Sequence, residues 1–142
     1  MAQYDYKCDF MVRDYEIDMQ GIVHHSVYIN YLEHCRSMYI LNLGIDVHKY
    51  HDIGYDLVVT HLAQDFKSPL RPKDEFYVTA NIKREGKLKI IFDQEIRRTI
   101  DNSLILIAKV ISVCLNNKTG KPCMPDILEN SLKKITIPIQ NL

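Results

Sequence analysis

The chain has 142 residues, and its 18 lysine and arginine side chains balance its 18 aspartates and glutamates. A chain of this length removes roughly two thirds of its unfolded surface from water, so we expect a single domain over residues 1–142. The scattered, balanced charge argues against nucleic-acid binding. No apolar run approaches the ~20 residues of a membrane span, and the first ten residues lack the pattern of a secretion signal. We therefore expect a cytoplasmic protein without stable membrane insertion.

The first half of the chain predicts a strand, a turn region and a long helix. Residues 4–13 have the pattern of a strand, and a carboxylate, a glycine turn and a histidine pair then lead into residues 26–43. Apolar residues recur there at steps of three and four, which predicts one helix with a buried face. These residues are Tyr28, Leu32, Cys35, Tyr39 and Leu43.

After the helix, Gly44 is a candidate left-handed cap, and we interpret the segment that follows as an irregular connection. Four more strands are predicted, over residues 56–67, 75–83, 88–98 and 104–115. Prolines in residues 68–74 interrupt the sheet pattern because proline cannot donate to a ladder, whereas residues 84–87 and 101–103 resemble hairpin turns.

Residues 104–115 are apolar almost throughout, so this strand should be central in the sheet or covered on both faces. Residues 126–142 are predicted as a short helix or as an arm bound to a partner. The order of one strand, a long helix and four strands predicts an α+β sandwich. One helix leaves much of a five-stranded sheet uncovered, so we expect a dimer.

Cysteine and histidine patterns do not favour a metal centre. The four cysteines have no C-x-x-C spacing, and we interpret them as free thiols in packing positions. His24 and His25 are adjacent at a helix entry without further ligands, and we interpret His48 and His51 as solvated loop residues. We expect neither a metal nor a cofactor.

Residues 15–36, YEIDMQGIVHHSVYINYLEHCR, carry the most specific pattern. They resemble the hotdog-fold acyl-CoA thioesterases, in the branch of 4-hydroxybenzoyl-CoA thioesterase and the tol-pal-associated acyl-CoA thioesterases. The resemblance implies a five-stranded antiparallel sheet wrapped around one long central helix. It depends on Tyr15, Asp18, Gly21, Val23, His25, Tyr28 and Glu33, and it extends to Phe66, Pro69, Asp74, Lys121, Pro122 and Pro125.

The resemblance implies that Asp18 and the backbone amide of His25 are the catalytic groups. Asp18 would act either as a nucleophile that forms a mixed anhydride or as a general base that orients water, and the sequence leaves both open. Amides at a helix start can stabilise the developing oxyanion, by roughly 2.7 to 4 kcal/mol for one donor. Gly21 would let the chain turn sharply between Asp18 and the helix.

The expected substrate-binding residues are Gly21, Val23, Tyr28, Glu33, Arg84, Lys87 and Lys89. Glu33 either supports the site through a hydrogen bond or is a buried acid paired with the neighbouring subunit. The three cations form a solvated hairpin, or some of them contact the phosphates of coenzyme A. Ile17 and the Met19–Gln20 pair depart from the family pattern, which indicates a differently shaped acyl pocket.

The leading hypothesis is hydrolysis of an acyl-CoA to a free acid and coenzyme A, at sites between the subunits of a homodimer or a homotetramer. One alternative is a hotdog protein that binds acyl-CoA or an acyl carrier protein without turnover; the presence of Asp18 argues against it. Another is a hotdog dehydratase, which depends on a histidine in a glycine- and proline-rich loop. No such loop precedes this helix.

Overall fold

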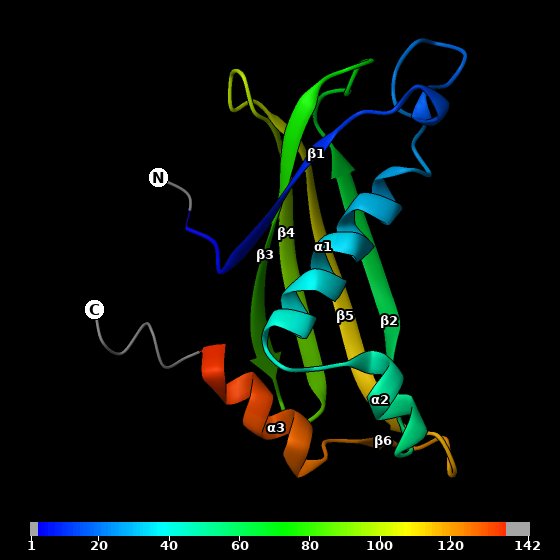
Figure 1. The fold of residues 1–142 in the computed structure, drawn as a ribbon, viewed down its shortest axis with the longest axis vertical. Coiled ribbons are helices and arrows are strands. Elements are labelled where there is room, and N and C mark those ends of the chain that lie inside the picture. Colours follow the sequence, from blue (N-terminus) through cyan, green and yellow to red (C-terminus); the bar gives the residue numbers. More distant parts are fainter. Residues whose placement is uncertain (1–2, 136–142) are drawn as a thin grey trace.

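The computed structural model describes residues 3–135, which form one antiparallel sheet with a long helix across one face (Figure 1). The helices are α1 (Tyr28–Asn42), α2 (Val47–Asp52) and α3 (Asp126–Leu132), with 3-10 turns at η1 (Asp14–Glu16) and η2 (Lys133–Ile135). The strands are β1 (Tyr6–Met11), β2 (Tyr55–Phe66), β3 (Glu75–Glu85), β4 (Lys89–Arg98), β5 (Leu104–Asn116) and β6 (Pro122–Cys123).

The strand order is β1-β3-β4-β5-β2, and the two-residue strand β6 pairs with the end of β5. The predicted hairpins join β3 to β4 and β4 to β5, which confirms both turns. The proline-containing residues 68–74 instead lead from one edge strand, β2, to β3 on the other side of the sheet. The long strand β2 therefore has a free edge, which matters for the site described below.

The core lies between α1 and the inner face of the sheet. The predicted apolar stripe of α1 is buried at four of its five positions, and Tyr31 joins it. On β3, the side chains of Phe76, Val78, Ala80 and Ile82 are buried as the alternating pattern indicated. The α+β hotdog architecture expected from the sequence is thus confirmed.

Two local expectations were wrong or incomplete. The segment after Gly44 contains the helix α2, whose first turn is capped because the Asp46 carboxylate accepts hydrogen bonds from the amides of His48 (3.1 Å) and Lys49 (3.3 Å). His48 and His51 therefore lie on a short helix. β6 was not predicted. The expectation for β5 is confirmed, because β5 is central in the sheet; within one chain only one of its faces is covered, and Ile107 on the other face is 39% exposed.

The C-terminal segment folds back onto the body of the protein. α3 confirms the short-helix alternative, and its Leu128 and Leu132 are buried against the core. Residues 136–142, which the arm hypothesis also covered, lie outside the described residues. Among residues 3–135, none of the helices has the length and apolar character needed to cross a bilayer.

Candidate active site

A short hairpin over residues 16–24 brings Asp18 to the start of α1. The amide of Asp18 donates to the carbonyl of Ile22 (2.8 Å), and the amide of His24 donates to the carbonyl of Glu16 (2.9 Å). At the tip, Gly21 has φ +81°, a conformation that side chains with a Cβ rarely adopt. The predicted sharp turn at Gly21 is present, but Gly21 does not line the cavity that Asp18 lines.

Asp18 is half-buried, and the backbone of its own turn holds its side chain. Its Oδ1 accepts hydrogen bonds from the amides of Gln20 (2.8 Å) and Ile22 (3.4 Å). Such an Asx turn limits the rotation of the carboxyl group. The carboxylate therefore has a defined orientation beside the cavity that it lines.

This cavity has a volume of about 410 Å³ and lies between the hairpin, the first turn of α1 and the end of β2. It unites four of the predicted site residues: Asp18, Val23, His25 and Tyr28. The sequence reading did not assign Ile22, Phe66, Lys67, Ser68 and Pro69 to the site, although they also line it. Phe66 and Pro69 had been noted only as matches to the family pattern.

The backbone of His25 has a property suited to anion binding. Among residues 3–135, the amide of His25 donates to no other group, and no side chain caps the N-terminus of α1. Unpaired amides at a helix start carry partial positive charge. The residues that line the cavity thus include a carboxylate and a residue with a free backbone donor, which are the two groups that acyl transfer to a carboxylate or to water requires.

The imidazoles of the histidine pair are occupied with local contacts. The ring of His24 stacks on the ring of His25 with centroids 4.3 Å apart, and its Nδ1 accepts from the amide of Ser26 (3.1 Å). Nowhere in the described part of the chain do three potential metal ligands cluster.

The hydroxyl of Tyr28 accepts a hydrogen bond from the amide of Leu70 (3.2 Å), and burial raises the pKa of this tyrosine.

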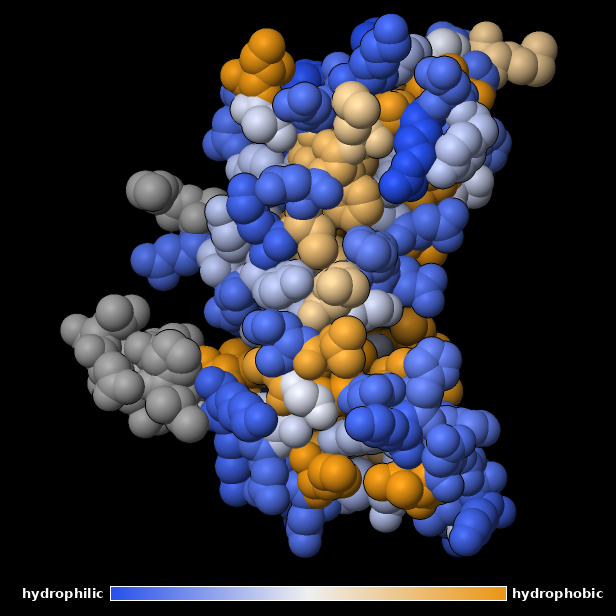
Figure 2. Space-filling view, in the orientation of Figure 1, coloured by the Kyte–Doolittle hydropathy of each residue, from blue (hydrophilic) through white to orange (hydrophobic). Residues whose placement is uncertain are grey.

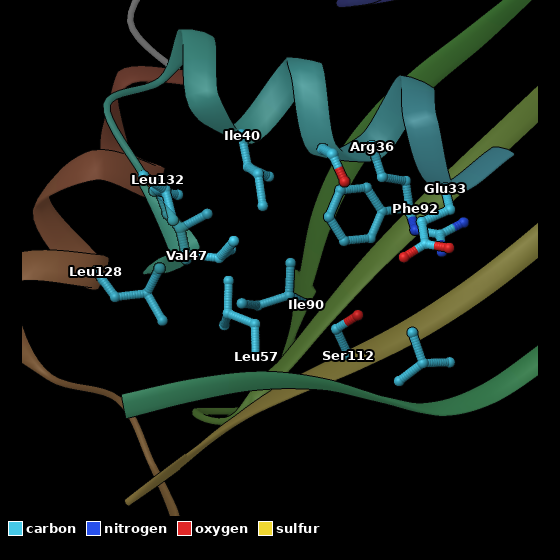
Figure 3. A pocket seen from close by; sticks show the side chains of 13 residues that line it. Glu33, Arg36, Ile40, Val47, Leu57, Ile90, Phe92, Ser112, Leu128 and Leu132 are labelled. Atoms are coloured by element: carbon cyan, nitrogen blue, oxygen red, sulfur yellow. The ribbon is translucent and has the colours of Figure 1, made fainter. Parts of the chain in front are cut away.

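Glu33 lies in a second cavity, not in the one that contains Asp18. This cavity, of about 200 Å³, lies between α1, the inner face of β2, β4 and β5, and the short helices α2 and α3 (Figure 3). Glu33 and Arg36 lie at one end, and Leu128 and Leu132 of α3 lie at the other. Its walls between these ends are mainly aliphatic, and Ser112 lies on the floor.

Arg36 is held in place at the polar end of the second cavity. Its Nη1 donates to Oε1 of Gln94 (3.1 Å), while Nε2 of that glutamine donates to the carbonyl of Leu32. Burial lowers the pKa of Arg36 from its usual value. The cavity therefore has a charged mouth and an apolar interior.

The hairpin cations are remote from Asp18 within one chain. Arg84, Lys87 and Lys89 lie where β3 meets β4, at the end of the sheet opposite the hairpin that bears Asp18 (Figure 1). Arg84 forms an ion pair with Glu129 of α3 (2.7 Å), and Lys89 lies 3.8 Å from Glu85. The single chain therefore does not bring these three residues to the predicted site.

A helix lying across a curved antiparallel sheet of this strand order, with a carboxylate at its N-terminus, defines a hotdog-fold protein of the thioesterase type. Residues 20–105 match the family model described as "Thioesterase superfamily". The chain belongs to this family.

Relatives and structural neighbours carry similar descriptions. The chain is 37% identical over 113 residues to a chloroplastic acyl-acyl carrier protein thioesterase of Arabidopsis thaliana; the match covers 80% of this chain but 60% of that relative. A putative esterase of Aquifex aeolicus is 29% identical over 72% of this chain and 86% of the relative. The chain thus spans about three fifths of the length of the plant relative.

Two solved structures illustrate the likeness of the fold. A 1,4-dihydroxy-2-naphthoyl-CoA thioesterase from Synechocystis has a TM-score of 0.85 at 16% identity, covering 92% of this chain and 96% of that one. A hypothetical protein from Aquifex aeolicus has a TM-score of 0.81 at 26% identity, covering 89% of this chain and 98% of that one. At 16% identity, the first comparison supports the fold alone.

Proposed function

We propose that this protein hydrolyses the thioester bond of an acyl-CoA, releasing a free acid and coenzyme A. The observation that carries the proposal is that Asp18 and His25, the latter with an unpaired backbone amide, line one cavity near the start of α1. A thiol-release assay over short, long, branched and aromatic acyl-CoAs tests it directly. Binding of these compounds without thiol release would favour the alternative of a binding protein without turnover.

The proposed chemistry assigns one role to each group. The amide of His25 donates a hydrogen bond to the thioester oxygen as negative charge develops on it, and the dipole of α1 adds to this stabilisation. Asp18 either attacks the carbonyl carbon and forms a mixed anhydride, or removes a proton from the water that attacks. Both roles use the ionised carboxylate, and the thiolate of coenzyme A is the leaving group in each.

An acyl carrier protein is a second candidate carrier for the acyl group, because the plant relative is described as an acyl-acyl carrier protein thioesterase. Both carriers present the acyl group as a thioester, so the chemistry at Asp18 would be the same. Comparing kcat/KM for one acyl chain on coenzyme A and on an acyl carrier protein distinguishes the two.

We also propose that two copies of the chain form the working unit, as a homodimer or within a homotetramer. β2 is a 12-residue strand at the edge of the sheet, so it presents unpaired backbone groups. Its inner face exposes Val59 (52%), Leu62 (36%) and Phe66 (52%). Apolar surface also runs down the middle of the face that carries α1 (Figure 2). A second copy paired along β2 would cover both features.

We propose that the acyl chain binds in the second cavity. Tyr28 lines the first cavity and Glu33 the second, and five helical residues correspond to about 7.5 Å along the axis of α1. An unbranched chain that leaves the thioester along this helix would reach aliphatic walls that end at Leu128 and Leu132. The preferred substrates are therefore expected to be aliphatic, with a length limit set by α3.

Filling this cavity should discriminate against long chains. We expect Ser112→Leu to lower kcat/KM for long acyl-CoAs about tenfold or more relative to a four-carbon acyl-CoA, since each displaced methylene loses about 0.8 kcal/mol of burial. Ser112→Ala, which leaves the cavity open, is the matched control. An equal loss of kcat/KM for all chain lengths would place the acyl chain elsewhere.

The cations of the β3–β4 hairpin can serve the site only from a second copy. Antiparallel pairing along β2 reverses the direction of the second sheet, so its hairpin end lies toward the Asp18 end of the first. We expect Lys87→Ala combined with Lys89→Ala to raise KM for acyl-CoA several-fold at unchanged kcat, because cations bind the coenzyme A phosphates. The matching acyl-pantetheine, which lacks the nucleotide phosphates, is the control substrate and should show no change in KM. A KM for acyl-CoA equal to that of the wild type would exclude these contacts.

A further inference from the structure

Glu16 is a buried acid that lies two residues before Asp18 and does not line the cavity that contains Asp18. Glu16 is 6% exposed, and its Oε1 accepts hydrogen bonds from the amide of Arg13 (2.8 Å) and from the hydroxyl of Tyr31 (2.7 Å). The guanidinium of Arg13 lies 3.8 Å from Oε2. A buried carboxylate with this many partners is strongly fixed in position.

The same residue forms the base of the hairpin that carries Asp18. The carbonyl of Glu16 accepts from the amide of His24, which is the residue immediately before His25. Tyr31, in contrast, belongs to α1, and its ring packs against the rings of both Phe10 and Phe76. The hydrogen bond between Glu16 and Tyr31 therefore ties the hairpin to the helix.

We propose that Glu16 and Tyr31 are positioning residues for the hydrolysis proposed above, on which this inference rests. Their buried hydrogen bond fixes the hairpin on α1 and so holds the carboxylate of Asp18 at a set distance from the amide of His25. Neither residue lines the cavity, so we expect neither to contact the substrate. Loss of the bond should lower kcat and leave KM nearly unchanged, because misplacing a reacting group by about 1 Å can cost on the order of 100-fold in rate.

Tyr31→Phe tests the proposal because it removes only the hydroxyl and keeps the packed ring. Tyr39→Phe is the matched control: Tyr39 is also buried on α1, and its hydroxyl interacts with the carboxylate of the exposed Asp5, away from the hairpin. We expect kcat to fall roughly 10- to 100-fold in Tyr31→Phe and to stay within about twofold of wild type in Tyr39→Phe. Equal kcat values in the two variants would overturn the proposal.

Substitutions at Glu16 provide the second arm. Glu16→Gln keeps an oxygen that can accept from Tyr31 and should retain most of kcat, whereas Glu16→Ala should lose as much as Tyr31→Phe. Combining Glu16→Ala with Tyr31→Phe should cost no more than Glu16→Ala alone, since both remove one interaction. Additive losses would mean that the two residues act separately. If Glu16→Ala fails to fold, the comparison of kcat between Tyr31→Phe and Tyr39→Phe still tests the proposal.

Hydrogen exchange separates this inference from the proposed function. The amides of Asp18 and His24 form the hairpin hydrogen bonds, so their exchange should accelerate in Tyr31→Phe and not in Tyr39→Phe. This readout needs no turnover. Accelerated exchange in a protein without thioesterase activity would uphold the coupling and reject the function, whereas wild-type exchange in an active enzyme would reject the coupling.

Discussion

Replacing Asp18 with asparagine should lower kcat by about three orders of magnitude. An amide is neither a nucleophile nor a base at neutral pH, and general-base catalysis alone contributes on the order of 10²–10⁴-fold. The fold should survive because an asparagine Oδ1 can accept the same hydrogen bonds from the amides of Gln20 and Ile22. Thiol release under saturating acyl-CoA measures kcat, and thermal unfolding verifies that the variant is folded.

Asp14→Asn is the matched control for this experiment. Asp14 lies four residues earlier in η1, is exposed, and does not line the cavity. It should keep the wild-type kcat, which shows that removing one negative charge near the hairpin is not itself harmful. A kcat for Asp18→Asn within tenfold of the wild-type value would reject Asp18 as the catalytic carboxylate, whichever of its two roles is assumed.

The sequence predicted where the helices and strands lie along the chain better than it predicted which strands pair. The spacing of apolar residues located α1 within two residues at each end, and the hairpins around residues 84–87 and 101–103 formed as expected. Periodicity, however, describes a segment by itself. That β2 pairs with β5 and not with β3 follows from the packing of the whole sheet, so the free edge at β2 was visible only in three dimensions.

Because sequence patterns describe only local structure, they also failed to show which of the predicted site residues lie apart in the fold. Asp18 and His25 are near in sequence and joined by one hairpin, so their shared cavity could be predicted from a local motif. Glu33 follows on the same helix, yet its side chain lies in the second cavity. Arg84 has a long side chain that could reach many groups, and the ion pair with Glu129 depends on where α3 docks. A local signal for α2 did exist, because aspartate at position 46 is a favoured N-cap.

Introducing a charge at the edge strand should separate two copies of the protein. If β2 pairs antiparallel with its counterpart over its full length, the two-fold axis passes near residues 60 and 61, and Leu62 lies opposite Val59 of the second copy. Leu62→Lys would place a charge in this apolar contact on each side of the axis, where unpaired buried charge is costly. We expect the dimer Kd to rise at least about a hundredfold, as measured by sedimentation over a range of concentrations.

Activity then shows whether the site needs the second copy. Ile100→Lys provides the control, because Ile100 is 90% exposed in the turn between β4 and β5 and is not part of the edge strand β2. The mass of the Ile100→Lys assembly in sedimentation and its kcat/KM should match those of the wild type. If the cavity that Asp18 lines is completed by a neighbour, Leu62→Lys should lose activity in proportion to dissociation, and raising the concentration of the variant should restore activity. A monomeric wild type would exclude the dimer, and a dissociated but fully active variant would show that one chain holds the complete site.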